Sequence, residues 1–235
     1  EACGHYEQSG SHANLGNVLA DRGERMLKAG FHKDIAGFLE SLDDGALDPS
    51  TQAKIWILRG NVHRVNGRWT DAIASFKKAL ELQKGGRALE AEMTARIASV
   101  HLASRNLATA RKTFERATKL LPAGNPAIEA RISDEMATLC LREGRLLDAR
   151  GLSDKAILLA QSSGNEELLG LCEATMGNVC LVTGDAPEGM LHFEKALASI
   201  KKARNVRIEG TILNNLGAIH YMQNEVAKAT DFWKM

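Results

Sequence analysis

The sequence has few aromatic residues, few prolines and almost no net charge. Aromatic side chains make up 5% of the 235 residues, whereas hydrophobic residues in total make up 44%, so Ala, Leu, Ile and Val supply most of the apolar content. These residues pack helices closely and suit β-sheets poorly, which favours an all-α fold. The 30 basic residues balance 29 acidic ones, and a formal charge of +1 gives no electrostatic reason to expect a nucleic-acid partner.

Long apolar runs and paired cysteines are also lacking. No stretch approaches the roughly 18 consecutive apolar residues of a membrane span, so we expect no membrane association. The four cysteines, at positions 3, 140, 172 and 180, lack the short spacing of a disulfide or zinc framework, and this usage fits the reducing cytoplasm. The chain begins at Glu1 without a signal segment, which suggests an excised or processed piece.

Catalytic motifs are missing as well. The sequence contains no G-x-x-x-x-G-K-[ST], H-E-x-x-H, G-x-S-x-G or C-x-x-C pattern. Most of the seven histidines recur at a regular spacing or lie near the N-terminus, so none stands out as a base. We therefore expect a protein that is not an enzyme and has no catalytic residue and no cofactor.

An internal repeat dominates what is present. Small anchor residues stand 38, 39, 40 and 40 positions apart, at Ala72, Ala110, Ala149, Gly189 and Ala229. Four positions later, four of the five units carry a large ring: Phe76, Phe114, Phe193 and Trp233. Twelve positions before the anchors and seven after them, all residues are again small: Gly60, Ala98, Ala137, Gly177 and Gly217, then Ala79, Ala117, Ala156 and Ala196. Helices whose axes lie about 8–10 Å apart need such small residues at the contact.

Each unit is predicted to be two amphipathic helices joined by a turn, because apolar residues recur at three- and four-residue steps on both sides of the turn. The turn holds Gly67, Gly144 or Gly184 in three units, and Arg105 or Asn224 in the others. Breaks between units are expected near Gly85-Gly86, Pro122 to Pro126, Ser162 to Asn165 and Arg204-Asn205. The predicted helices are 49–66, 70–83, 87–104, 108–121, 126–142, 146–162, 166–183, 187–201, 206–223 and 226 onward, after a degenerate pair at 12–29 and 32–43.

The predicted fold is an all-α, right-handed α-solenoid of tandem helical hairpins. We expect an N-terminal helical pair over residues 1–48, followed by about five repeats at 49–86, 87–125, 126–165, 166–205 and 206–235. The last repeat ends before its third small residue, so we expect the parent chain to continue beyond Met235. We also expect the exposed final helix to pack on a neighbouring molecule, so that the chain self-associates through it. A fully solvated final helix with Trp233 bare would count against this expectation.

The repeat resembles the tetratricopeptide repeat, whose pattern is W-x2-L-G-x2-Y, then A-x3-F, then P. The best-matched unit reads Trp56, Arg59, Gly60, His63, Gly67, Trp69, Ala72, Phe76, Ala79, Leu80. The resemblance covers about residues 50–235. The units here have 38–40 residues instead of 34, and only Pro122 keeps the closing proline.

The long units and the degenerate leading pair, with Ala29-Gly30-Phe31, also resemble the repeat domains of bacterial signal-transduction ATPases and MalT-like regulators. In that family such a domain is a sensor arm that binds an inducer or an inhibitory protein. Motor-protein light chains and peptide-sensing regulators use similar long repeats.

The resemblance implies that the first helix of each repeat lines a concave groove. In peptide-binding members, an asparagine directly after the first small residue holds the backbone of an extended peptide, and Asn61 and Asn178 occupy that place here. The alternative is that asparagine is simply tolerated on a solvated groove. The candidate ligand-binding residues are Asn61, Arg64, Arg131, Asp134, Thr138, Asn178, Asn214 and Tyr221.

One series of metal-capable residues lies three positions after each first small residue: His63, His101, Cys140, Cys180 and His220. Equivalent positions in successive hairpins are about 10 Å apart, whereas the ligands of one ion lie about 2–2.3 Å from it. We therefore expect no metal site and interpret the series as residues packed inside the hairpins. Cys172 and Cys180 are two turns apart on one helix and cannot form a disulfide.

These features predict a non-enzymatic scaffold that binds a protein or peptide segment in its groove and belongs to a larger bacterial signalling or regulatory protein. Two alternatives stay open: a small-molecule sensor domain of a MalT-like transcriptional regulator, and a structural or dimerisation arm. A closed pocket with converging polar groups would favour the sensor, and an open groove lined by Asn61, Asn178 and Asn214 would favour a peptide.

Overall fold

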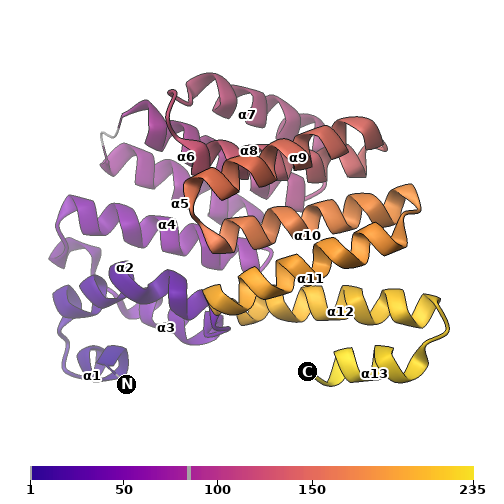
Figure 1. The fold of residues 1–235 in the computed structure, drawn as a ribbon. Coiled ribbons are helices and arrows are strands. Elements are labelled where there is room, and N and C mark those ends of the chain that lie inside the picture. The colour runs from indigo at the N-terminus through magenta and orange to yellow at the C-terminus, as the bar shows by residue number, and fades with distance from the viewer. Residues whose placement is uncertain (1, 84–85) are drawn as a thin grey trace. The chain divides into compact units, whose positions relative to one another are not determined.

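The computed structural model describes residues 2–83 and 86–235, and within them it contains helices and no β-strand (Figure 1). This confirms the all-α class. The helices are α1 (Ala2–Gln8), α2 (His12–Lys28), α3 (His32–Ser41), the 3₁₀ helix η1 (Asp44–Ala46), α4 (Pro49–Val65), α5 (Trp69–Leu82), α6 (Arg87–Ala103), α7 (Leu107–Leu120), α8 (Pro126–Arg142), α9 (Leu146–Ser163), α10 (Glu166–Thr183), α11 (Ala186–Ala203), α12 (Val206–Met222) and α13 (Val226–Lys234). In the described part of the chain, no helix is both long enough and apolar enough to cross a lipid bilayer.

The helix boundaries agree with the sequence prediction to within about two residues, and those of α8 and α10 agree fully. Helix α8 starts at Pro126 as predicted, and α4 starts at Pro49 with the Asp48 carboxylate accepting hydrogen bonds from the Ser50 and Thr51 amides. One predicted break between repeats is Gly85-Gly86. Gly86 directly precedes α6, and Gly85 lies outside the described residues. The repeat pattern did not predict α1 or η1.

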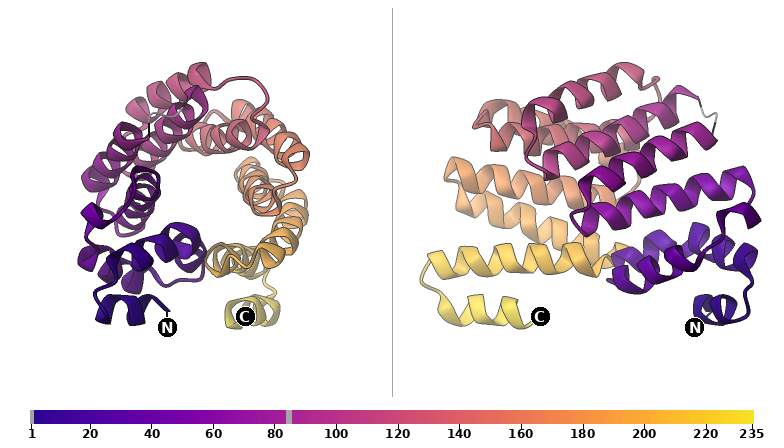
Figure 2. Two further views of the ribbon diagram at one scale, coloured as in Figure 1. Left: turned by 90° about the vertical axis from the view of Figure 1, so that its left-hand side faces the viewer. Right: turned by 180° about the vertical axis from the view of Figure 1, so that it is seen from behind.

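The chain divides into two compact units, one ending at Pro122 and the other running from Ala123 to Met235. Unit 1 contains α1 to α7, and unit 2 contains α8 to α13. In each unit, consecutive helices pair as antiparallel hairpins, which the left view of Figure 2 shows roughly along the helix axes. We call the leading helix of each repeat (α4, α6, α8, α10, α12) its first helix and the other its second helix.

The turns between the two helices of each repeat all use left-handed backbone. The φ angles are 71° at Gly67, 63° at Arg105, 73° at Gly144, 88° at Gly184 and 63° at Asn224. These are the five turn positions that the repeat frame identified. A residue in this conformation ends a helix, and glycine adopts it without the steric cost that Arg105 and Asn224 incur.

Small residues allow the two helices of a hairpin to approach closely. The anchors Ala72, Ala110, Ala149 and Ala229 are completely buried, as are the rings of Phe76, Phe114 and Phe193. A methyl group at Gly60 would lie 2.5 Å from the Phe76 ring, and one at Gly177 would lie 2.9 Å from the Phe193 ring. In the last hairpin, Trp233 covers Gly217 in the same way but stays 49% exposed.

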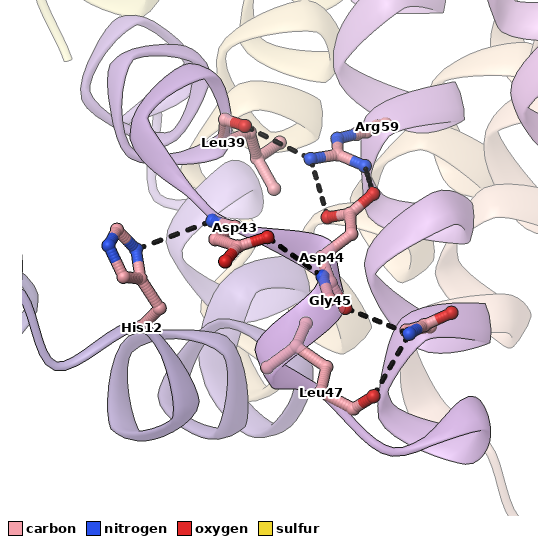
Figure 3. Close-up of polar contacts among 8 residues, drawn as sticks. His12, Leu39, Asp43, Asp44, Gly45, Leu47 and Arg59 are labelled. Carbon is pink, nitrogen blue, oxygen red and sulfur yellow. Dashed lines mark hydrogen bonds and ion pairs between the residues drawn. The ribbon is translucent and has the colours of Figure 1, made fainter.

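The N-terminal pair is attached to the first repeat by a polar cluster around Arg59 (Figure 3). The Arg59 guanidinium on α4 donates to both carboxylate oxygens of Asp44 in η1 and, at 3.1 Å, to the Leu39 carbonyl at the end of α3. Its other face covers Trp56, 4.6 Å from the ring centroid. Only 14% of the Arg59 side chain is exposed, so this pair is much less screened by water than the surface pairs of the chain.

Replacing Gly177 with Ala should destabilise unit 2 by about 1–3 kcal/mol, because the added methyl collides with the buried Phe193 ring. The matched control is Gly151→Ala in α9, where a methyl group meets no atom within 4 Å. That change should stabilise the protein by about 0.5–1 kcal/mol through helix propensity alone. Urea unfolding followed by circular dichroism measures both, and a stabilising Gly177→Ala would contradict the close-approach interpretation.

Replacing Arg59 with Met should destabilise unit 1 by about 1–3 kcal/mol, because the half-buried Asp44 carboxylate loses its charged donor. Arg68→Met is the control: Arg68 forms an exposed pair with Asp71, whose loss should cost less than about 1 kcal/mol. Urea titrations followed by tryptophan fluorescence compare the two variants. Equal effects would show that the Arg59 cluster adds no more than a surface ion pair.

Candidate functional site

In unit 1, the predicted contact residue Asn61 lies on α4 and is only 7% exposed. Its Nδ2 donates to the Glu24 carboxylate of α2 at 3.1 Å, and its Oδ1 accepts from Arg96 of α6 at 3.2 Å. Arg96 also donates to Glu92 at 2.8 Å. The Asn61 amide therefore connects three neighbouring helices. Arg64, one turn further along α4, is half-buried.

In unit 2, the predicted residues lie on the first helices α8, α10 and α12, and they differ in exposure. Asn178 on α10 and Asn214 and Tyr221 on α12 are exposed, whereas Arg131 and Thr138 on α8 are half-buried. Asn178 Oδ1 accepts a hydrogen bond from Asn215 of α12 at 3.4 Å. Among the described residues, Asn178 Nδ2 has no partner, so its N–H groups are available to a ligand. We call these three exposed residues on the first helices of unit 2, Asn178, Asn214 and Tyr221, the amide face of unit 2.

The two asparagine contacts occupy the same places in the repeat. Asn61 and Asn178 directly follow the first small residue of their repeats, and each accepts a hydrogen bond from the next repeat. The donors, Arg96 and Asn215, both stand two positions before the first small residue of that next repeat. In both units, the asparagine at this position therefore accepts a hydrogen bond from the next first helix. Asn178 in unit 2 also faces solvent, whereas Asn61 in unit 1 does not.

The comparison with family models matches one family over residues 51–123, and its description is tetratricopeptide repeat. This segment runs from the first turn of α4 to just past α7. Residues 51–123 therefore match the tetratricopeptide repeat. No curated protein shows significant sequence similarity to it.

Solved structures with similar folds include signalling and regulatory proteins that contain helical repeats. A Rap protein complexed with competence and sporulation factor has a TM-score of 0.71 at 15% identity, over 85% of this chain and 56% of that one. A signal transduction ATPase from Pyrococcus horikoshii with a tetratricopeptide repeat sensor has a TM-score of 0.67 at 17% identity, over 93% of this chain and 33% of that one. Aspartyl phosphate phosphatase F from Bacillus subtilis has a TM-score of 0.62 at 17% identity, over 77% of this chain and 48% of that one. The chain therefore shares their fold and spans from one third to just over half of their lengths.

Asp134 on α8, another of the predicted contact residues, is buried. It is 9% exposed, and its Oδ1 is enclosed without a hydrogen-bond partner. Burial raises the pKa of Asp134 to about 7, and the neighbouring Glu135 adds to the increase, while Thr175, Arg131 and Cys172 oppose it. A ligand could reach this carboxyl group only if the helices around it moved.

A cavity of about 340 Å³ lies in the last hairpin, between α12 and α13. It is lined by Gly210, Leu213, Asn214, Phe232, Trp233 and Met235. Only Asn214 and Trp233 bring polar side-chain atoms to it, and the Trp233 Nε1 lies 3.5 Å from the Asn214 carbonyl oxygen. The cavity lacks the converging polar groups that would favour a small-molecule sensor.

The series of histidines and cysteines packs inside the hairpins as predicted. His63 and His101 are half-buried, and desolvation lowers the pKa of both imidazoles. Cys140 and Cys180 are buried, and so is His220, which stacks on Phe232. Desolvation also raises the pKa of Cys172 and, with the Glu188 hydrogen bond contributing, raises that of Cys180 to about 11.

The sequence reasoning missed the partners of the predicted residues. Glu24, Arg96 and Asn215 surround the asparagines, and Glu188 and His192 lie beside Cys180. The repeat frame holds the signal for Arg96 and Asn215, because both stand two positions before a first small residue. Comparing polar residues between neighbouring repeats, and not only along one stripe, would have identified them.

The buried Asp134 predicts a pH-dependent stability. Its folded-state pKa of about 7 lies above the ordinary value of 3.8, so the folded chain keeps a proton that the unfolded chain loses between these pH values. The stability from the protonated carboxyl is complete below about pH 4 and is lost as the pH rises through about 7. Asp134→Asn should therefore stabilise the protein at pH 8 by about 1–3 kcal/mol and have little effect at pH 4.

Urea unfolding at the two pH values measures this difference. The control is Asp154→Asn, which removes an exposed carboxylate from α9. Equal effects of Asp134→Asn at pH 4 and pH 8 would contradict the raised pKa.

Proposed function

We propose that the chain is a non-enzymatic interaction domain that binds a peptide or protein segment along the amide face of unit 2. The observation that carries the proposal is the exposure of the Asn178 and Asn214 amides on neighbouring first helices. An amide side chain both donates and accepts hydrogen bonds, as a peptide group does. Tyr221, about two turns beyond Asn214 on α12, adds an exposed ring that can pack against a partner's side chain.

Asn61 has a different role in this proposal. Its amide is buried and already bonded to Glu24 and Arg96, so a peptide would have to break both interactions to use it. Breaking hydrogen bonds to charged groups costs about 1.5–3 kcal/mol each. We therefore assign ligand binding to the exposed amide face and a positioning role to Asn61 and its partners in unit 1.

Arg131 and Thr138 on α8 extend the proposed site beyond the amides. Both are half-buried and lie on the helix that packs against α10. Arg131 can pair with an acidic side chain of the partner, whereas Asp134 between them is enclosed. The proposed ligand is therefore an extended segment with an acidic residue toward α8 and a bulky side chain toward Tyr221.

The folds of the solved structures support a regulatory setting. One is a Rap protein complexed with competence and sporulation factor, and another is an ATPase with a tetratricopeptide repeat sensor. Because this chain spans only part of those proteins, we propose that it acts as the recognition part of a larger signalling protein.

A peptide selection tests the proposal directly. Wild-type chain is used to select binders from a phage-displayed library of random 12-residue peptides, and the affinity of the best binder is measured by calorimetry. Replacing Asn178 and Asn214 together with Ala should weaken this binding at least about tenfold, because two hydrogen bonds are lost. The matched control removes an exposed amide from a second helix, Gln161→Ala on α9, and should leave the affinity unchanged.

Two outcomes would contradict the proposal. If the library yields no binder, a structural or dimerisation arm is favoured. If binders are obtained but the double variant binds them as tightly as wild type, the ligand lies elsewhere on the chain.

A further inference from the structure

We propose that the hairpin of α10 and α11 holds a site for Zn²⁺ or a similar thiophilic divalent cation, formed by Cys180, Glu188 and His192. One ligand atom from each residue lies within 4.8 Å of the others. Cys180 comes from α10, and Glu188 and His192 lie one turn apart on α11. Thiolate, carboxylate and imidazole are the three ligand types that zinc uses in proteins.

The distance between the first two ligands suits tetrahedral coordination. Cys180 Sγ lies 3.4 Å from Glu188 Oε2. With zinc bonds of about 2.3 Å to sulfur and about 2.0 Å to oxygen, this separation gives an S–Zn–O angle of about 104°, close to the tetrahedral value of about 109°. A tetrahedral site places nitrogen about 3.3–3.5 Å from the other two ligands, so ligand atoms at the 4.8 Å limit would have to approach by about 1.5 Å.

Two of the proposed ligands, His192 and Glu188, are each already oriented by another residue. The His192 Nδ1 forms a 2.6 Å hydrogen bond with the Glu173 carboxylate, which leaves Nε2 for a metal ion. The Glu188 Oε1 accepts from Arg150 at 2.6 Å, which leaves Oε2 directed at Cys180. Metal-bound histidines in proteins usually donate their other N–H group to a carboxylate or carbonyl in this way. Glu173 is only 6% exposed, and in this arrangement its carboxylate orients the His192 imidazole.

The charges at the site also fit a divalent cation. Zinc binding replaces the Cys180 thiol proton, which is released to solvent, and the thiolate and the Glu188 carboxylate then neutralise the two positive charges. Three protein ligands leave the fourth position of the ion for water. Metal binding would fix α10 to α11 near their turn.

The other hairpin of unit 2 with a cysteine at the same repeat position lacks this arrangement. Cys140 corresponds to Cys180, but Leu152 stands where His192 does, and Ser133 where Glu173 does. Asp148, at the place of Glu188, pairs instead with Arg145 at 2.6 Å. Cys140 is therefore a buried thiol in an equivalent position without the other ligands, and it provides a matched control.

Cobalt provides the test, because Co²⁺ bound to a thiolate gives a characteristic charge-transfer absorption. The full chain, kept reduced, is titrated with Co²⁺ and then with Zn²⁺, which should displace the cobalt. We expect one equivalent of thiolate-bound cobalt in the wild type and in Cys140→Ser. Cys180→Ser should lose the thiolate band, and His192→Gln and Glu188→Gln should weaken binding at least about 100-fold.

Glu173→Gln tests the positioning role of Glu173. It should weaken binding about 10–100-fold while the thiolate band remains at saturating cobalt, a combination that simple unfolding would not produce. If Cys180→Ser does not fold, as judged by circular dichroism, the His192 and Glu188 variants decide the question. A wild-type chain without a thiolate band, or a band that persists unchanged in His192→Gln, would overturn the proposal.

Discussion

The close approach of paired helices at fixed alanines and glycines is the constraint on which the rest of the structure depends. A ring from the second helix fills the space beside the first small residue, and at Gly60 and Gly177 even one methyl group would collide with that ring. The contact fixes how far each second helix lies from its first helix and how the two are rotated. It therefore determines which residues of the first helix remain free to face away from the hairpin.

This constraint explains why the repeat frame predicted so much of the fold. The anchor spacing located the helices to within about two residues. It also identified the five left-handed turns inside the repeats, two of them at residues other than glycine. Backbone geometry follows from residue size and from the turn, and both are visible in the sequence. Helix η1 was missed because no periodic pattern marks its contacts: the Asp43 side chain caps it locally, and Arg59, fifteen positions further on, bonds to Asp44.

The sequence predicted where the candidate residues lie in the repeats, but not whether their side chains are exposed. The frame placed Asn61 and Asn178 at equivalent places, and both do form the same bond to the next first helix. Whether an amide is also exposed depends on its neighbours: Glu24 and Arg96 enclose Asn61, while the shorter Asn215 leaves half of the Asn178 amide open. Asp134 is enclosed for a similar reason, because α10 packs over it. Such differences come from residues about 35–40 positions away, so they require a structure.

The same distinction between position and surroundings applies to the cysteines. Comparing the metal-capable residues along successive hairpins predicts ligands that lie too far apart for one ion. The arrangement around Cys180 arises in the other direction, across a single hairpin, where the small Gly189 brings α11 close to α10. Glu188 directly precedes that glycine and His192 follows it by three positions, so the contact that holds the hairpin together also brings both side chains to the thiol. The backbones of the repeats are nearly alike, so chemical differences between repeats must come from side chains beside the recurring helix contact. In unit 2, the hairpin of α10 and α11 is the one where three metal-capable side chains come together.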